Sequence, residues 1–144
     1  MEPAVDLEGL VRAAGDAIVV ADSEGLIRLW NPAATRIFGF SPEEAVGQSL
    51  DLIIPERFRA RHWAGYREVM RTGQTRYGAD VLRVPALHKD GRRVSVAFTV
   101  ALLTDPSGRV TGIAAIVRDE TARWAEEQAL RRRVAELEGR GRPA

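Results

Sequence analysis

One histidine, His62, lies in a pattern that gives its imidazole a chemical use. Phe58, His62, Tyr66 and Val69 fall at i, i+4, i+8 and i+11 of a helix expected over residues 55–72. This spacing places them on one face of the helix, and that face is the apolar one, so His62 should point into the interior. A neutral imidazole presented from a helix into an apolar pocket is the geometry that haem iron needs on its proximal side. The alternative is a core or semi-buried histidine that hydrogen-bonds its neighbours.

Other kinds of site chemistry find little support in the composition. The chain has no cysteine, which excludes disulfides, thiolate chemistry and zinc–thiolate sites. Its two histidines, His62 and His88, do not make a metal site, and His88 should be solvated beside the turn at residues 89–91. We find no phosphate-binding glycine loop, nucleophile elbow, or kinase or cyclase signature, so an enzyme is not expected.

Length and charge narrow the class of protein further. A chain of 144 residues with 45% hydrophobic residues can bury one core, which favours a single domain. The net charge of +1 gives no reason to expect nucleic acid or an acidic membrane as a partner. No apolar run approaches the roughly 20 residues that span a bilayer, and the first residues lack the features of a signal peptide. We therefore expect a cytoplasmic protein that binds neither nucleic acid nor membrane.

Alternation and turn residues predict an antiparallel sheet. The expected strands cover residues 17–21, 26–30, 76–87, 94–102 and 110–117. Large apolar residues alternate with small or polar ones along residues 94–102, which indicates one buried face. Asp22-Ser23-Glu24-Gly25, Asp90-Gly91 and Asp105-Pro106-Ser107-Gly108 supply the turns. The result is a five-stranded antiparallel sheet.

Short helices should cover this sheet. Asn31 can cap a helix that begins at Pro32, and Ser41-Pro42-Glu43-Glu44 forms a capping box. Pro55 begins a longer helix that Thr72-Gly73 ends. Because these helices fall between the second and third strands, they must pack over the apolar face of the sheet. The space between the two layers is where a ligand would bind.

The chain divides into four expected segments. An amphipathic N-terminal helix occupies residues 1–15, a folded domain residues 16–119, a C-terminal helix residues 120–138 and a disordered tail residues 139–144. The two flanking helices carry apolar residues at helical spacing, namely Leu7, Leu10, Val11, Leu130, Val134 and Leu137. The C-terminal helix follows Asp119 without a flexible linker, so any shift in the sheet must move it.

Several landmarks in this order resemble a PAS domain over about 100 of the 144 residues. They are Asp22-Ser23-Glu24-Gly25, Trp30-Asn31-Pro32-Ala33-Ala34, residues 38–44, Lys89-Asp90-Gly91-Arg92 and Arg118-Asp119-Glu120-Thr121. The resemblance implies an α+β PAS fold, with short helices over one face of the sheet and a helix at either end. It also implies ligand sensing, a homodimer, and relay to a histidine kinase, cyclase or other effector, in trans or in a longer chain. It does not fix the ligand.

A closer resemblance suggests haem b as the ligand. Residues 55–62 are similar to the haem-bearing helix of oxygen-sensing PAS kinases, which makes His62 the implied iron ligand. Phe98 and Val100 match positions that hold large apolar residues against bound gas, and Leu82 stands where those kinases carry an arginine that hydrogen-bonds oxygen. Glu68 stands where they carry a propionate-binding arginine, for which Arg67, Arg71 or Arg76 could substitute. The expected pocket residues are His62, Tyr66, Tyr77, Leu82, Phe98 and Val100.

Two other readings remain open. One is a sensor of another small ligand such as flavin, bound without the photochemistry that needs a cysteine. The other is an interaction and dimerisation module whose pocket is filled by Tyr77, Leu82 and Phe98. Small strand residues favour an open cavity, namely Ala79, Ala97, Ala101, Ala114 and Ala115. Trp63 should point to a different face from His62, either as an exposed contact for a partner or against the N-terminal segment.

Overall fold

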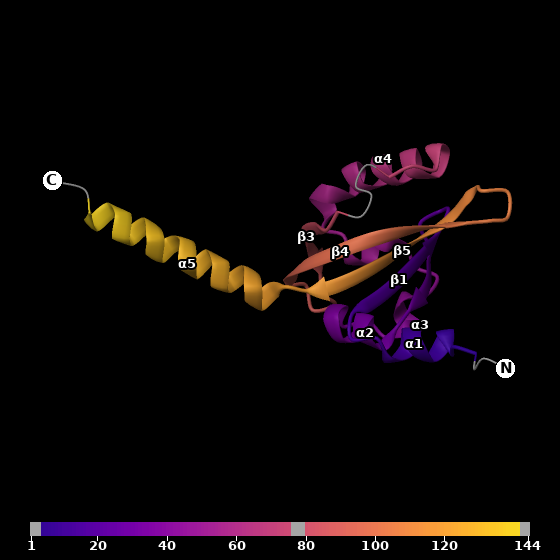
Figure 1. Ribbon diagram of the computed structural model, residues 1–144, viewed down its shortest axis with the longest axis horizontal. Coiled ribbons are helices and arrows are strands. Elements are labelled where there is room, and N and C mark those ends of the chain that lie inside the picture. The colour runs from indigo at the N-terminus through magenta and orange to yellow at the C-terminus, as the bar shows by residue number, and fades with distance from the viewer. Residues whose placement is uncertain (1–3, 76–79, 142–144) are drawn as a thin grey trace.

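The computed structural model describes residues 4–75 and 80–141 and contains a five-stranded antiparallel sheet (Figure 1). The strands are β1 (Ala17–Asp22), β2 (Ile27–Trp30), β3 (Leu82–Leu87), β4 (Arg93–Thr104) and β5 (Val110–Asp119). Their order across the sheet is β2-β1-β5-β4-β3, with every neighbouring pair antiparallel. The predicted sheet is therefore confirmed. The third strand begins at Leu82, later than expected, and Arg76, Tyr77 and Ala79 lie outside the described residues.

Helices fill the connection between β2 and β3 and flank the domain, as predicted. They are α1 (Leu7–Ala13), α2 (Pro32–Phe38), α3 (Pro42–Ala45), the 3-10 helix η1 (Leu50–Ile53), α4 (Glu56–Thr72) and α5 (Thr121–Arg140). Asn31 caps α2, Ser41 and Glu44 form the expected capping box of α3, and Gly73 ends α4 in a left-handed conformation with φ 71°. The local sequence signals thus define where these helices begin and end.

The strand register decides which side chains share a face of the sheet. Phe98 pairs with Leu82 on one side and Val117 on the other, and Val100 pairs with Ala115. Successive residues of a strand point to opposite faces, so Phe98 and Val100 lie on the face that carries Val117 of the core. Three alanines expected near a cavity occupy the alternate register positions and face the other way, namely Ala97, Ala101 and Ala114. That part of the cavity prediction was wrong.

The core lies between this face and the short helices. Its buried members are Ala17, Val19, Ile27, Trp30, Ala33, Ala34, Phe38, Ala45, Ala86, Val94, Val96 and Val117. Trp30 is 5% exposed, and its Nε1 donates to Thr35 Oγ1 at 3.2 Å and to the Phe40 carbonyl at 3.0 Å. Asn31 is also buried, and its side chain bonds to backbone groups of α1, β1 and α2. These two residues join the helices to the sheet.

The β3–β4 hairpin packs on the short helices, which corrects the expectation for His88. The His88 side chain is only 15% exposed because it packs over Gly39, where an added Cβ would lie 2.5 Å from its Cε1. Its Nδ1 accepts a hydrogen bond from the Asp90 amide at 3.1 Å. The neighbouring Lys89 amide donates to the Phe38 carbonyl at 2.8 Å. His88 is thus a packing residue of the hairpin and is not solvated.

The two flanking helices are the least covered elements. Neither α1 nor α5 contains a buried residue, and α5 extends away from the domain (Figure 1). Only Glu120 separates β5 from α5, as expected. The helix ends at Arg140, so Gly139 and Arg140 are helical although we placed them in the tail, and residues 142–144 lie outside the described range. Among the helices of residues 4–75 and 80–141, none is long and apolar enough to cross a membrane.

Candidate functional site

Two aromatic side chains near His62 tie helix α4 to the 3-10 helix η1 and to strand β1. Trp63 donates from its Nε1 to Asp51 Oδ1 of η1 at 2.7 Å. Tyr66 is 7% exposed and donates from its hydroxyl to the carbonyl of Asp22 at 2.5 Å. Burial and the nearby Asp22 carboxylate raise the pKa of Tyr66 to about 12, so its hydroxyl stays protonated and can donate. The part of α4 that carries His62 is therefore fixed at two points.

His62 lies between these rings in a largely apolar setting. It is half-buried, and its ring centroid lies 4.6 Å from that of Trp63 and 5.7 Å from that of Tyr66. Its Nδ1 is buried and finds no hydrogen-bond partner in the part of the chain that the structure describes. Burial lowers the pKa of His62, against the opposing influence of the Asp51 carboxylate. The imidazole is thus kept neutral at pH 7, the form that binds metals.

Trp63 does not lie where the sequence led us to expect. It is half-buried, and its indole packs over Gly25 in the β1–β2 turn. The prediction failed because residue 63 is one position from His62 on the helix, and a large indole can still reach around the helix to a nearby turn. Asp51 and Gly25, two of its contacts, carried no sequence signal for this role.

The remaining expected pocket residues fall into a second group on the sheet. Leu82, Phe98 and Val100 are half-buried on one face of β3 and β4. Val84 and Leu102 share that face, and Val84 is 42% exposed although it is apolar. The helices therefore leave this part of the apolar face incompletely covered. Tyr77 lies outside the described residues.

Two surface hollows lie elsewhere on the molecule. One, of about 600 Å³, lies between the end of α4 and the β4–β5 hairpin, and is lined by residues 70–73 and 107–110. The other, of about 460 Å³, lies between α1 and residues 29–32. His62 lines neither of them, so neither hollow is the predicted ligand site.

The charged residues near α4 depart from the pattern of the haem-binding kinases. Glu68 pairs with Arg71 at 2.7 Å, and both side chains are exposed. Arg83 points away from the face of Leu82 and pairs with Glu120, its Nε lying 3.6 Å from Oε2. Leu82 itself offers no hydrogen-bond donor from its side chain. That Glu68 and Leu82 stand in place of arginines which contact a propionate and bound oxygen in those kinases stays a prediction.

The donor set fits a group that needs one protein ligand. Among residues 4–75 and 80–141, no three side chains of the His, Cys, Asp or Glu type come together to hold a metal ion. A bare zinc ion needs three or four such ligands, whereas haem iron needs a single proximal imidazole. His62 has a neutral ring with an unpartnered buried nitrogen, so the residues present fit haem better than a bare ion.

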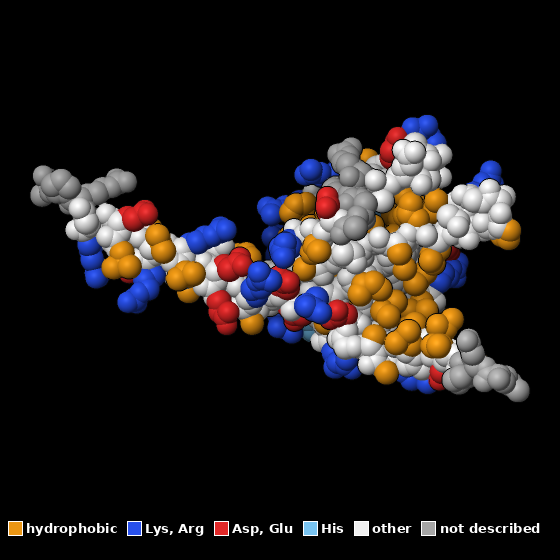
Figure 2. Space-filling view, in the orientation of Figure 1, with side chains coloured by type: hydrophobic (Ala, Val, Ile, Leu, Met, Phe, Trp, Pro, Cys, Tyr) orange, Lys and Arg blue, Asp and Glu red, His pale blue; other side chains and the backbone are white. Residues whose placement is uncertain are grey.

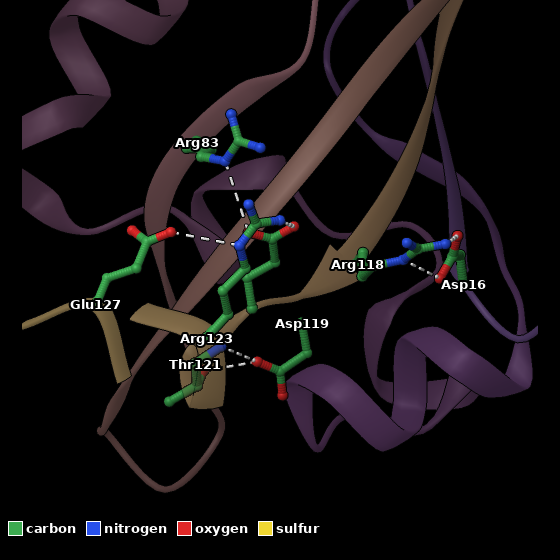
Figure 3. Close-up of polar contacts among 8 residues, drawn as sticks. Asp16, Arg83, Arg118, Asp119, Thr121, Arg123 and Glu127 are labelled. Carbon is green, nitrogen blue, oxygen red and sulfur yellow. Dashed lines mark hydrogen bonds and ion pairs between the residues drawn. The ribbon is translucent and has the colours of Figure 1, made fainter. Parts of the chain in front are cut away.

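A network of polar contacts fixes the start of α5 (Figure 3). Asp119 Oδ1 accepts from the Thr121 amide at 2.9 Å and from its hydroxyl at 2.6 Å. Thr121 Oγ1 in turn accepts from the Ser95 amide of β4 at 3.1 Å, and the Glu120 amide donates to the Ser95 carbonyl at 2.7 Å. These bonds join the end of β5, the start of β4 and the first turn of α5.

Two arginines, from β3 and α5, lie near the Glu120 side chain, which belongs to the one residue between β5 and α5. The Glu120 side chain is 16% exposed and lies 3.6 Å from Arg83 Nε of β3 and 3.7 Å from Arg123 Nη1 of α5. On the other side of the junction, Arg118 pairs with Asp16 at 3.1 Å, ahead of β1 (Figure 3). The sequence marked residues 118–121 as a landmark of the PAS resemblance but gave no signal for the partners of Glu120.

Comparison with known proteins agrees with this architecture. A family model described as the PAS fold matches residues 6–119. The chain is 31% identical over 133 residues to the sensor protein FixL of Bradyrhizobium diazoefficiens, covering 92% of this chain and 25% of FixL. It is 25% identical over 125 residues to the oxygen sensor protein DosP of Escherichia coli, covering 87% of this chain and 15% of DosP. The chain thus spans a quarter or less of the length of these two relatives.

Solved structures place the fold in the same class. The PAS domain of a protein from Colwellia psychrerythraea superimposes with a TM-score of 0.70 at 23% identity, covering 80% of this chain and 94% of that one. The sheet order, the helices between β2 and β3 and the family model together define a sensory α+β module. The chain belongs to the PAS family.

Proposed function

We propose that this chain is a sensory PAS domain, not itself an enzyme, that binds haem b through His62. It would sense a gas or the oxidation state of the iron. The observation that carries the proposal is the His62 imidazole, which is neutral, half-buried among aromatic rings and, within the described part of the chain, unpartnered at Nδ1. Similarity to FixL and to the oxygen sensor DosP over most of this chain supports the same reading.

The site residues would act in two groups. His62 would supply the proximal ligand from α4, and Tyr66 would hold that helix against β1. Leu82, Phe98 and Val100 would provide the apolar surface on the sheet, and Tyr77 remains an expected pocket residue. The bound group would supply the reversible binding of small gases and the redox change.

The residue at position 82 bears on which gas or redox change the domain would sense. Oxygen acquires negative charge when it binds ferrous iron, and a nearby hydrogen-bond donor stabilises it. Leu82 provides none, so we propose carbon monoxide, nitric oxide or a change of iron oxidation state as the signal in preference to oxygen. Poor oxygen affinity or fast autoxidation is expected for the same reason.

The output would pass through α5 of a homodimer to a histidine kinase, a cyclase or another effector. Exposed apolar residues support dimerisation, since Leu7 and Leu10 of α1 are 68% and 60% exposed and Ile116 of β5 is 38% exposed. Hydrophobic side chains gather on the face of the molecule that Figure 2 shows. Patches of this kind mark interaction sites. The cytoplasmic location stays a prediction.

Reconstitution with haem tests the proposal directly. The wild-type protein should show a sharp Soret band, and its ferrous form should bind carbon monoxide. His62→Ala should lose axial ligation while its circular dichroism stays unchanged, because no sheet hydrogen bond is removed. Added imidazole should partly restore the spectrum by filling the space that the side chain leaves.

The second histidine provides a matched control. His88→Gln removes the other imidazole of the chain, on the β3–β4 hairpin, and should leave the haem spectrum unchanged. If wild type and His62→Ala bind haem equally weakly with identical spectra, the haem proposal is wrong. The domain is then an interaction module or a sensor of another ligand, and the fluorescence of purified protein would reveal a bound flavin.

A further inference from the structure

The indole of Trp63 occupies space that any side chain at position 25 would block, and position 25 is a glycine. A Cβ built on Gly25 would lie 2.2 Å from two carbons of the Trp63 ring, far inside van der Waals contact. The indole therefore packs directly on the backbone of the β1–β2 turn. Gly25 also has a φ of 81°, so a side chain there would be strained for two separate reasons.

The polar end of the same indole is held by a second element. Trp63 Nε1 donates to Asp51 Oδ1 at 2.7 Å, and Arg59 Nε lies 3.9 Å from that oxygen. A charged acceptor makes this hydrogen bond stronger than a neutral one. The ring is thus fixed between the β1–β2 turn and η1, although it belongs to α4.

The His62 imidazole packs against this ring. The orientation of a metal-binding imidazole is usually fixed by a hydrogen bond from one of its ring nitrogens. His62 Nδ1 has no such partner among residues 4–75 and 80–141. Its ring instead meets Trp63 edge to face, with centroids 4.6 Å apart and planes at 78°. Aromatic packing is the contact left to set the ring angle.

We propose that Trp63, packed on Gly25 and hydrogen-bonded to Asp51, is the positioning residue that sets the orientation of the His62 imidazole. The role of that orientation in metal ligation rests on the proposed function. The orientation itself is a property of the protein without any bound group. The two can therefore be tested separately.

Nuclear magnetic resonance of the ligand-free protein tests the orientation. The chain has only two histidines, so the ring protons of His62 are assigned by comparison with His88→Gln. Trp63→Leu should shift the His62 ring protons and broaden them, because the ring current disappears and the imidazole samples several angles. Trp124→Leu, on the exposed face of α5, should leave them unchanged.

Substitutions at two glycines test the same contact while Trp63 itself is kept. Gly25→Ala and Gly47→Ala carry the same backbone strain, with φ of 81° and 92°, but nothing lies within 4 Å of a Cβ at Gly47. Gly25→Ala should displace the indole and move the His62 signals, whereas Gly47→Ala should not. Equal effects of the two substitutions would overturn the proposal.

Replacements at Asp51 separate positioning from plain stability. At about pH 9 the imidazole is neutral in every variant, so the Asp51 charge no longer affects its titration. Asp51→Asn keeps an oxygen acceptor for the indole and should then preserve the His62 signals, while Asp51→Leu should move them. After haem loading, Trp63→Leu should lose haem to apomyoglobin about 10-fold faster than wild type, as for outer-shell partners of metal ligands, and Asp51→Asn should stay near wild type. Unchanged His62 signals in Trp63→Leu would overturn the proposal. Shifted signals in a protein that takes up no haem would support positioning and contradict the proposed function.

Discussion

At the scale of single residues, Tyr66 combines burial with a hydrogen bond that requires its proton. Tyr66→Phe removes the bond to the Asp22 carbonyl but keeps the ring, and should lower the free energy of unfolding by about 1 kcal/mol at pH 7. Its pKa is raised to about 12 in the folded state from 10.0, so the folded protein binds its proton more tightly than the unfolded chain. This stabilisation is fully present below pH 10 and is lost as the pH rises through 12.

Urea unfolding as a function of pH checks this prediction. The stability of wild type should fall between pH 10 and 12, and the fall should be smaller in Tyr66→Phe. Every other titrating group is common to the two proteins, so its contribution cancels in the comparison. An equally steep decline in the two proteins would show that Tyr66 titrates normally.

At the scale of elements, Thr121 couples the exit helix to the sheet. Thr121→Val removes the hydroxyl that accepts from the Ser95 amide and donates to Asp119. The first turn of α5 should then separate more often from β4. A cost of about 1 kcal/mol corresponds to roughly five-fold faster hydrogen exchange at the Ser95 and Glu120 amides.

Thr111→Val is the matched control for this exchange measurement. Thr111 is an exposed residue of β5 whose hydroxyl makes only a 3.4 Å contact with the Leu103 carbonyl. Its replacement should leave the exchange of the α5 junction at the wild-type rate. If Thr111→Val accelerated hydrogen exchange at the junction as much as Thr121→Val does, the junction would open only when the whole domain unfolds.

The elements of this fold were readable from the sequence because their signals are local. Asn31 with Pro32, the Ser41–Glu44 capping box and the turn at Asp90-Gly91 define boundaries through contacts a few residues apart. The misplaced residues, Trp63 and His88, are those whose packing depends on distant backbone. Each packs on a glycine that is distant in the sequence. The position of a glycine in the sequence does not indicate which side chain will pack on it.

At the scale of the whole molecule, α5 is a 20-residue helix with no buried residue. Isolated helices are marginally stable in water, and helices in proteins gain most of their stability by packing an apolar face, so we expect this one to need a partner. Leu130, Val134 and Leu137 form a stripe with the four-three spacing of a coiled coil, and are 63%, 46% and 55% exposed. Glu126 and Arg133 stand beside this stripe, each five residues before a residue of opposite charge, Arg131 and Glu138. In a parallel pair of helices such residues face each other across the seam.

Cysteine cross-linking should therefore reveal a parallel dimer in register. The chain has no native cysteine, so Leu130→Cys introduces a single thiol in the stripe, where the two copies would meet. Mild oxidation should convert it to a disulfide-linked dimer at micromolar concentration. Arg132→Cys lies on the opposite side of the helix and should cross-link much more slowly. Equal cross-linking of the two variants would indicate random collision, and light scattering that finds only monomer at millimolar concentration would contradict the homodimer itself.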